Sequence, residues 1–236
     1  MRVAATLSYD GTHFFGSQVQ SETKKTIFGI FEAVLFELGI DSRTVASGRT
    51  DKGVHAIGQV CHFDVPDFWS DLVRLKDTLN QKLPLSIHVR ALKEVDAAFH
   101  ARYSAKKRSY RYLIKVGESN PFEANFITFV KSLAFSEVEK NIKLFQGEHD
   151  FKNFMKTGSD SSNSRRTIYK AFAYRHKGYI ILHFQANGFL RSQIRLMVGA
   201  LLTLDAQEIQ ERLKSKNTRA LKPAPSNGLY LSKILY

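Results

Sequence analysis

The stretch ASGRTDKGVHAIGQVCHF, residues 46–63, leads from a loop crowded with charge into a run that has the pattern of a strand. The charged and titratable side chains of the loop are Arg49, Asp51, Lys52 and His55. Two glycines, Gly48 and Gly53, permit a sharp backbone path. Such a corner is either a tight turn with solvated charges or an active-site loop, and residue spacing leaves both interpretations open.

The strand predicted after this loop has one apolar face and one mixed face, because side chains alternate along a strand. The apolar face carries Ile57, Cys61, Phe63 and Val65. The other face carries Gly58, His62 and Asp64. We expect the apolar face to be buried and Pro66 to end the strand.

On both sides of this strand, the first half of the chain is predicted to contain both strands and helices. A strand over residues 2–10 ends at the turn pair Asp10-Gly11, and apolar residues at helical spacing predict a helix from Thr26 to Gly39. A helix near 69–82 and a strand over 87–95 follow.

The second half repeats this mixture of strands and helices. The predicted elements are a strand at 109–116, a helix near 136–146, a hairpin of 167–176 with 179–186, a long helix from 189, and a strand at 229–236. The pattern predicts an α+β protein of two units, residues 1–98, which contain the loop 46–56, and residues 99–236.

Composition favours an RNA or DNA partner in a reducing compartment. The chain has 236 residues and a formal net charge of +13, which suits a phosphate backbone. One cysteine allows no intrachain disulfide, and MRVAATLSYD lacks the apolar core of a signal peptide. The longest apolar run, residues 196–204, is too short to span a bilayer. We therefore expect a cytoplasmic protein without a membrane span.

The sequence lacks the residues that metal sites, phosphate-binding P-loops and serine or cysteine nucleophiles require. One cysteine and scattered histidines provide no metal-binding spacing, so no metal is expected. Gly48 and Gly53 have P-loop spacing, but Val54-His55 stand where a P-loop needs Lys and Ser or Thr. The chain also has no G-x-S-x-G elbow, and Cys61 lies on an apolar strand face.

Asp51 is the remaining candidate for covalent chemistry. A carboxylate near an arginine such as Arg49 stays ionised and nucleophilic at neutral pH. An aspartate at a glycine-bounded corner is also a common turn residue, and periodicity does not decide between the two.

Five separated blocks of the chain resemble one family, the TruA-type tRNA pseudouridine synthases. The blocks are SYDGTHFFGSQVQ (8–20), ASGRTDKGVHAIGQVCHF (46–63), FHARYSAKKRSYRYLI (99–114), NGFLRSQIRLMVGALL (187–202) and NGLYL (227–231). They span residues 8 to 231, and the second resembles the signature AGRTDxGVHA with one substitution, Ser47. A further departure is Ser17, where the family pattern has Trp, and the chain is short for the family.

The resemblance implies a fold and a reaction. The fold would be two ferredoxin- or RRM-like α/β subdomains that form a continuous, mainly antiparallel sheet flanked by helices, with the catalytic cleft between them. The reaction would isomerise uridine to pseudouridine on the 3′ side of the tRNA anticodon stem-loop, at family positions 38–40. It requires no cofactor.

The resemblance also implies residue roles. Asp51 would be the nucleophile, attacking carbon 1′ or carbon 6; Tyr110 would stack on the base and assist proton transfer; and Arg195 would pair with Asp51. Helical periodicity independently puts Arg195 at the margin of an apolar stripe. The expected substrate-binding residues are Arg49, which would fill the space left by the flipped base, Leu229, Lys52, His55, Arg165 and Arg166. Of these, Lys52 and His55 would be loop supports or phosphate contacts and not catalysts.

The expected partner is tRNA, contacted at its anticodon arm and elbow by a homodimer. The polar loop 156–166, which ends in Arg165 and Arg166, is suited to touch phosphates. Two other functions stay open: an RNA-binding protein that has lost catalysis, and a nucleoside-cleaving hydrolase, which would need a second carboxylate.

Overall fold

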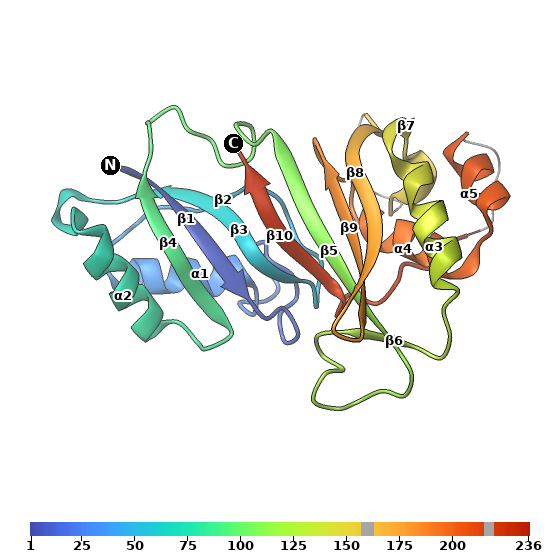
Figure 1. Ribbon diagram of the computed structural model, residues 1–236. Helices are drawn as coiled ribbons and strands as arrows, with labels where there is room; N and C mark the ends of the chain where they lie inside the picture. Colours follow the sequence, from blue (N-terminus) through green and yellow to red (C-terminus); the bar gives the residue numbers. More distant parts are fainter. Residues whose placement is uncertain (157–162, 215–219) are drawn as a thin grey trace. The chain divides into compact units, whose positions relative to one another are not determined.

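The computed structural model describes residues 1–156, 163–214 and 220–236 (Figure 1). The chain divides into two compact units, Met1–Lys106 with Tyr230–Tyr236, and Lys107–Leu229. Each unit combines a mostly antiparallel sheet with helices, so the α+β class is confirmed. The expected division at residues 98 and 99 lies just before this one, and the C-terminal strand returns to the first unit.

The first unit is built on four neighbouring strands in the order β4-β1-β3-β10. Its strands are β1 (Arg2–Tyr9), β2 (Val45–Ala46), β3 (His55–Asp64), β4 (Ile87–Glu94) and β10 (Leu229–Leu235). Its helices are α1 (Ile27–Glu37), η1 (Asp67–Trp69) and α2 (Leu72–Lys82). β1 pairs antiparallel with β3 and with β4, whereas β10 runs parallel to β3.

Local sequence explains the helix that precedes the charged loop. The Thr26 side chain accepts a hydrogen bond from the backbone N–H of Gly29 and so caps α1. Gly39, at φ +74°, ends the helix in a conformation that favours glycine. The predicted helix is confirmed, as are the strands that became β1, β3 and β4.

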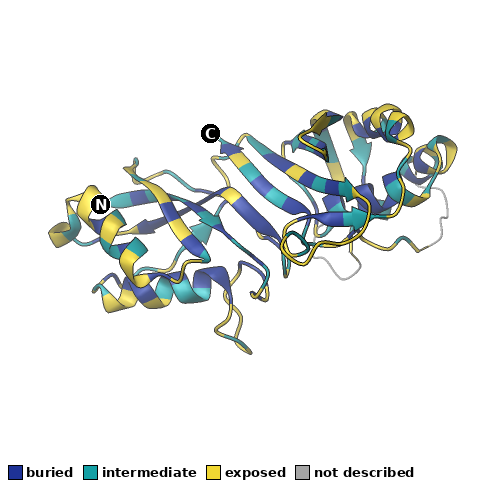
Figure 2. Cartoon of the chain, turned by 60° about the horizontal axis from the view of Figure 1, so that its bottom comes forward, coloured by how far each residue is buried: buried dark blue, intermediate teal, exposed yellow. Residues whose placement is uncertain are grey.

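The burial expected for β3 is wrong in one respect. Ile57 is 39% exposed, while Gly58 and His62, on the opposite face, are buried. Figure 2 shows how buried, intermediate and exposed residues follow one another along the strands. Distant segments cover that face: a Cβ on Gly58 would lie 2.5 Å from the Ser232 carbonyl oxygen, and Ala101 N–H donates to His62 Nδ1. Sequence periodicity contains no information about such cover.

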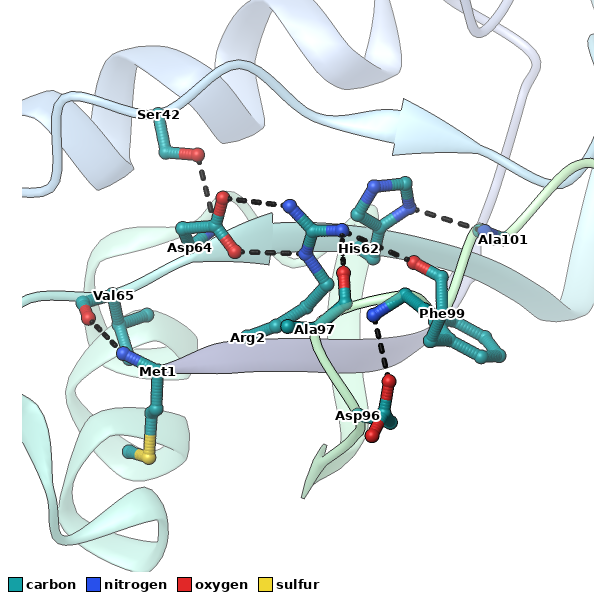
Figure 3. Close-up of polar contacts among 11 residues, drawn as sticks. Met1, Arg2, Ser42, His62, Asp64, Val65, Asp96, Ala97, Phe99 and Ala101 are labelled. Atoms are coloured by element: carbon teal, nitrogen blue, oxygen red, sulfur yellow. Dashed lines mark hydrogen bonds and ion pairs between the residues drawn. The ribbon is translucent and has the colours of Figure 1, made fainter.

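The far end of β3 is tied to the loop that follows β4 (Figure 3). The Arg2 guanidinium donates two hydrogen bonds to the Asp64 carboxylate, at 2.9 and 3.0 Å. Its Nη1 also donates to the backbone oxygens of Ala97 and Phe99. This arginine therefore joins β1, β3 and the loop.

We expect the melting temperature to fall as pH decreases from about 7.5 to 5.5. Burial, with the positive charges of Arg2 and His100, lowers the pKa of His62 from 6.5. The unfolded chain therefore binds more protons in this window, and the folded state loses stability as pH falls. Calorimetry of His62→Asn, whose amide oxygen can still accept from Ala101 N–H, should show a smaller decrease. An identical decrease in both proteins would contradict this assignment.

The second unit has a four-strand path in the order β5-β9-β8-β7. Its strands are β5 (Lys107–Val116), β6 (Thr128–Val130), β7 (Gly147–Asp150), β8 (Arg165–His176) and β9 (Tyr179–Ala186). Its helices are α3 (Phe135–Asn141), η2 (Ile142–Phe145), η3 (Lys152–Phe154), α4 (Gln193–Thr203) and α5 (Ala206–Leu213). The path is antiparallel throughout, and β6 pairs parallel with β5.

The predicted hairpin is confirmed, and the long helix begins later than expected. Lys177 and Gly178 both have positive φ, 48° and 82°, as a two-residue hairpin turn requires. α4 begins at Gln193 rather than 189, after Ser192 at φ +58°. No helix among the described residues is long and apolar enough to cross a membrane.

Candidate active site

The loop that carries Asp51 is a tight turn. The backbone N–H of Val54 donates to the Asp51 carbonyl oxygen at 3.1 Å, and Gly53 adopts φ +76°. Asp51 is half-buried, whereas Arg49 and Lys52 on either side of it are exposed. The carboxylate is thus held at a corner and is still partly accessible.

Ser17 anchors this loop through two hydrogen bonds. The Ser17 N–H donates to the Thr50 carbonyl oxygen at 3.1 Å, and the Thr50 N–H donates to the Ser17 hydroxyl oxygen at 2.9 Å. Ser17 is completely buried. Beside it, Gly16 has φ +106°, and a Cβ there would lie 3.0 Å from the Thr50 oxygen. The residue next to Asp51 is therefore fixed by a segment more than thirty positions earlier in the chain.

A buried polar network holds the loop from its other side. The Tyr9 hydroxyl lies 2.8 Å from Thr50 Oγ1 and receives a 3.5 Å hydrogen bond from Gln59 Nε2. Gln59 also donates to the Gly48 oxygen and accepts from the Ser47 hydroxyl, at 2.8 and 2.7 Å. Burial raises the pKa of Tyr9 to about 12, so its hydroxyl stays protonated at neutral pH. A satisfied network of this kind rigidifies the loop.

His55, which follows the Asp51 loop, packs inside the protein against residues of β10 and of the segment after β1. The ring is 1% exposed and stacks on Tyr230, with 4.7 Å between ring centroids. Its Nδ1 lies 3.1 Å from the Gly11 backbone nitrogen and 3.2 Å from Asp10 Oδ1. A Cβ on Gly11 would lie only 2.1 Å from the Val54 oxygen, so this close approach requires glycine. These contacts place His55 within the protein rather than on an RNA-facing surface.

Lys52 covers an aromatic ring that sequence reasoning missed. Its Nζ lies 4.4 Å from the ring centroid of Phe15, which is 45% exposed. Phe15 reads as an ordinary apolar residue, and only its position in the block 8–20 could have marked it. The pair offers a positive charge and a ring edge beside the Asp51 loop.

In the second unit, Tyr110 is part of an aromatic pair. Tyr110 is buried on β5, and the Phe189 ring packs edge-on against it, with 5.3 Å between centroids. Phe189 belongs to the loop between β9 and α4. Sequence reasoning assigned no role to Phe189, which orients the tyrosine ring.

Arg195 is half-buried on α4 and binds the segment that leads to Leu229. Its Nε donates to the Ala224 oxygen at 2.8 Å, and the Ala224 N–H donates to the Arg195 oxygen at 2.8 Å. A Cβ on Gly199 would lie 2.3 Å from the Lys222 oxygen, which shows how closely this segment crosses the helix. Leu229 is buried at the start of β10.

Arg165 and Arg166 begin β8. Arg165 is exposed, and its guanidinium lies 3.4 Å from Glu148. Arg166 donates to the Asn163 oxygen at 2.9 Å, and burial, with the charge of Arg108, lowers its pKa. Of the polar loop expected to touch phosphates, residues 157–162 lie outside the described residues.

The expected site residues divide between the two units. Unit 1 holds Arg49, Asp51, Lys52 and His55 on one loop. Unit 2 holds Tyr110, Arg165, Arg166, Arg195 and Leu229. The assembly of these residues around one nucleotide is a proposal taken up below.

The chain matches a family model described as tRNA pseudouridine synthase over residues 5–104 and 142–236. It belongs to that family. It is therefore an isomerase that acts on uridine in tRNA. The resemblance noted in the sequence is confirmed.

Similar proteins that match this tRNA pseudouridine synthase over nearly their full length support the same family assignment. The protein called tRNA pseudouridine synthase A of Wolinella succinogenes is 38% identical over 237 residues, which cover 98% of this chain and 93% of the relative. Its namesake in Geobacillus sp. (strain WCH70) is 39% identical over 250 residues, covering 100% and 98%. That of Helicobacter hepaticus is 38% identical over 242 residues, covering 98% of each.

Proposed function

We propose that this tRNA pseudouridine synthase modifies uridine on the 3′ side of the anticodon stem-loop, with Asp51 as the nucleophile and no cofactor. The observation that carries this proposal is the anchoring of the Asp51 loop. Hydrogen bonds with Ser17 and Gln59 hold the backbone just before the half-buried Asp51 carboxylate, and the Tyr9 hydroxyl bonds the Thr50 side chain. A nucleophile needs this combination of fixed position and access.

The reaction breaks the bond between uridine N1 and carbon 1′ and forms a bond from carbon 5 to carbon 1′. The hydrogen on carbon 5 leaves as a proton, and N1 gains one, so no oxidant or other reactant is required. If Asp51 attacks carbon 1′, it displaces uracil and is itself displaced as carbon 5 bonds to carbon 1′. If it attacks carbon 6, it adds to the ring and is eliminated after the new bond has formed. Both routes are compatible with a half-buried carboxylate.

The other residues are assigned roles by their type and place. Arg49, exposed beside Asp51, would occupy the space that the flipped base leaves in the stack. Tyr110 would stack on the uracil and serve the proton transfer, Arg195 would pair with Asp51, and Leu229 would form an apolar wall. In this proposal His55 and Lys52 support the loop, and each unit is ferredoxin- or RRM-like.

The net charge of +13 supports binding of tRNA through its anticodon arm and elbow. We propose that a homodimer in the cytoplasm performs this binding, so that one tRNA contacts both subunits. Sedimentation of the chain with and without tRNA tests the stoichiometry.

Tritium release tests the reaction. The protein is incubated with unmodified tRNA that carries tritium on carbon 5 of uridine, and tritium in water is counted. We expect one tritium released for each pseudouridine formed, without release of free uracil. A folded protein that binds this tRNA but releases no tritium would be a binding module, and released uracil would identify a hydrolase.

Replacing Arg165 and Arg166 together with alanine should weaken tRNA binding and flatten its salt dependence. Each phosphate contact contributes about 0.7–0.9 to the slope of log K against log salt, so the double variant should lose up to about 1.8. Fluorescence anisotropy over a salt series measures this slope. Lys140→Ala with Lys143→Ala removes the same charge from exposed positions near α3 and is the control. Equal salt-dependence slopes for the two double variants would show that Arg165 and Arg166 do not contact the RNA phosphates.

A further inference from the structure

An exposed aromatic ring projects from the loop between β4 and β5. Tyr103 is 76% exposed, and one side of its ring stacks on His100, with 4.3 Å between centroids and 28° between planes. The Arg102 guanidinium lies 5.6 Å from the same ring. Single exposed aromatic side chains are common on protein surfaces, so the case for a function here rests on what holds this ring in place and on the charge beside it.

The backbone of the loop holds this ring in place. His100 Nδ1 accepts hydrogen bonds from the N–H groups of Arg102 and Tyr103, both at 3.2 Å. The Ser104 N–H donates to the His100 oxygen at 2.9 Å, and the His100 N–H donates to the Ser104 hydroxyl oxygen at 3.1 Å. The His100 ring is therefore held in a fixed position, and the Tyr103 ring stacks against it.

The loop is in turn bound to the sheet of the first unit (Figure 3). Ala101 donates to His62 on β3 and accepts from the Tyr236 hydroxyl at 2.9 Å, while Arg2 binds the oxygens of Ala97 and Phe99. Because these contacts fix the loop before any partner arrives, Tyr103 loses little conformational freedom on binding.

The Tyr103 loop and the Asp51 loop are attached near opposite ends of β3. His55, which follows the Asp51 loop, begins β3, and His62, which anchors the Tyr103 loop, is seven residues further along this strand. At about 3.3 Å per residue, the two ends are about 23 Å apart. A ligand on Tyr103 is therefore a different group from the uridine that reacts.

We propose that Tyr103 and Arg102 form a stacking platform for an unpaired base of the tRNA, at a second contact remote from the reacting uridine. Every base has a π-face, and aromatic rings beside arginine bind single-stranded nucleotides by stacking. Exposed Arg102 and Lys106 supply charge for the adjoining phosphates, which an apolar protein interface would not require. The proposal rests on tRNA as the substrate but not on Asp51 as the nucleophile.

Kinetics of Tyr103→Ala on full-length tRNA test this platform. Loss of one base–aromatic stack corresponds to about a 5- to 150-fold loss of affinity, so KM should rise by at least fivefold while kcat is unchanged. Tyr103→Phe keeps the ring and should behave like the parent protein. Phe122→Ala removes an even more exposed ring, 88% accessible, from the other unit and is the control.

Tryptophan fluorescence tests directly whether tRNA contacts position 103. Trp69 is the only tryptophan, so Trp69→Phe combined with Tyr103→Trp leaves one fluorophore on the platform. We expect unmodified tRNA to quench its fluorescence, and to do so equally when Asp51→Asn is added. Unchanged KM in Tyr103→Ala, or no quenching by bound tRNA, would overturn the proposal. So would a shift of Tyr103→Ala from dimer to monomer without tRNA, because the ring would then be a subunit contact.

Discussion

Asp51→Asn is expected to abolish turnover while tRNA affinity changes by less than a few-fold. Asparagine has nearly the same size as aspartate and leaves the turn to Val54 N–H intact, since that bond uses the backbone oxygen of residue 51. It lacks the negative charge and the nucleophilic oxygen, so turnover should fall at least about 1,000-fold. Single-turnover tritium release measures the chemical step, and anisotropy with labelled tRNA measures binding.

The control for this variant removes a carboxylate elsewhere in the same unit. Asp41 is exposed and lies outside the loop, so Asp41→Asn should retain parental turnover and affinity. If Asp51→Asn also turned over at the parental rate, another group would have to be the nucleophile. A loss of affinity as large as the loss of turnover would instead assign Asp51 to RNA binding.

Elements with a local cause were predictable from the sequence. α1 follows from Thr26 as its cap and Gly39 as its end, and the β8–β9 hairpin follows from Lys177-Gly178. α5 was missed although Asp205 and Glu208 form a capping box at its start. Its short apolar face was absorbed into the preceding helix, because α4 and α5 are separated by two residues only.

The candidate site was predictable only as a set of residue types. The sequence shows that Ser17 departs from the family pattern, but the bonds it makes join positions 33 residues apart. Alternation places Gln59 on the same face of β3 as Cys61 and Phe63, which agrees with its burial, but it does not predict that Gln59 joins Ser47 to Gly48. Such contacts depend on how strands pack against loops, which no local pattern encodes. The pairing of Arg195 with Asp51 stays a prediction.

The second large effect is expected at Ser17, which we infer positions the nucleophile without touching the substrate. In Ser17→Ala the buried Thr50 N–H loses its acceptor, which costs about 1–3 kcal/mol. The backbone before Asp51 then relaxes, and a misplaced reacting group costs up to about 100-fold in rate. We expect kcat to fall about 10- to 100-fold with KM for tRNA unchanged.

Ser42→Ala separates positioning from general stability. Ser42 accepts a hydrogen bond from the Asp64 N–H at 2.9 Å, as Ser17 accepts one from the Thr50 N–H, but the Ser42 bond is exposed and lies at the far end of β3. Both variants should lower the melting temperature, whereas only Ser17→Ala should lower kcat, and Ser17→Thr, which keeps a hydroxyl, should recover part of it. Parental kcat in Ser17→Ala, or an equal loss of kcat in Ser42→Ala, would show that the Ser17 bond stabilises the fold without orienting Asp51. The distinction matters because the position of the Asp51 carboxylate depends on the backbone that carries it. Gly53 permits the sharp turn after Asp51, and the Ser17 bonds to Thr50 fix the backbone before it.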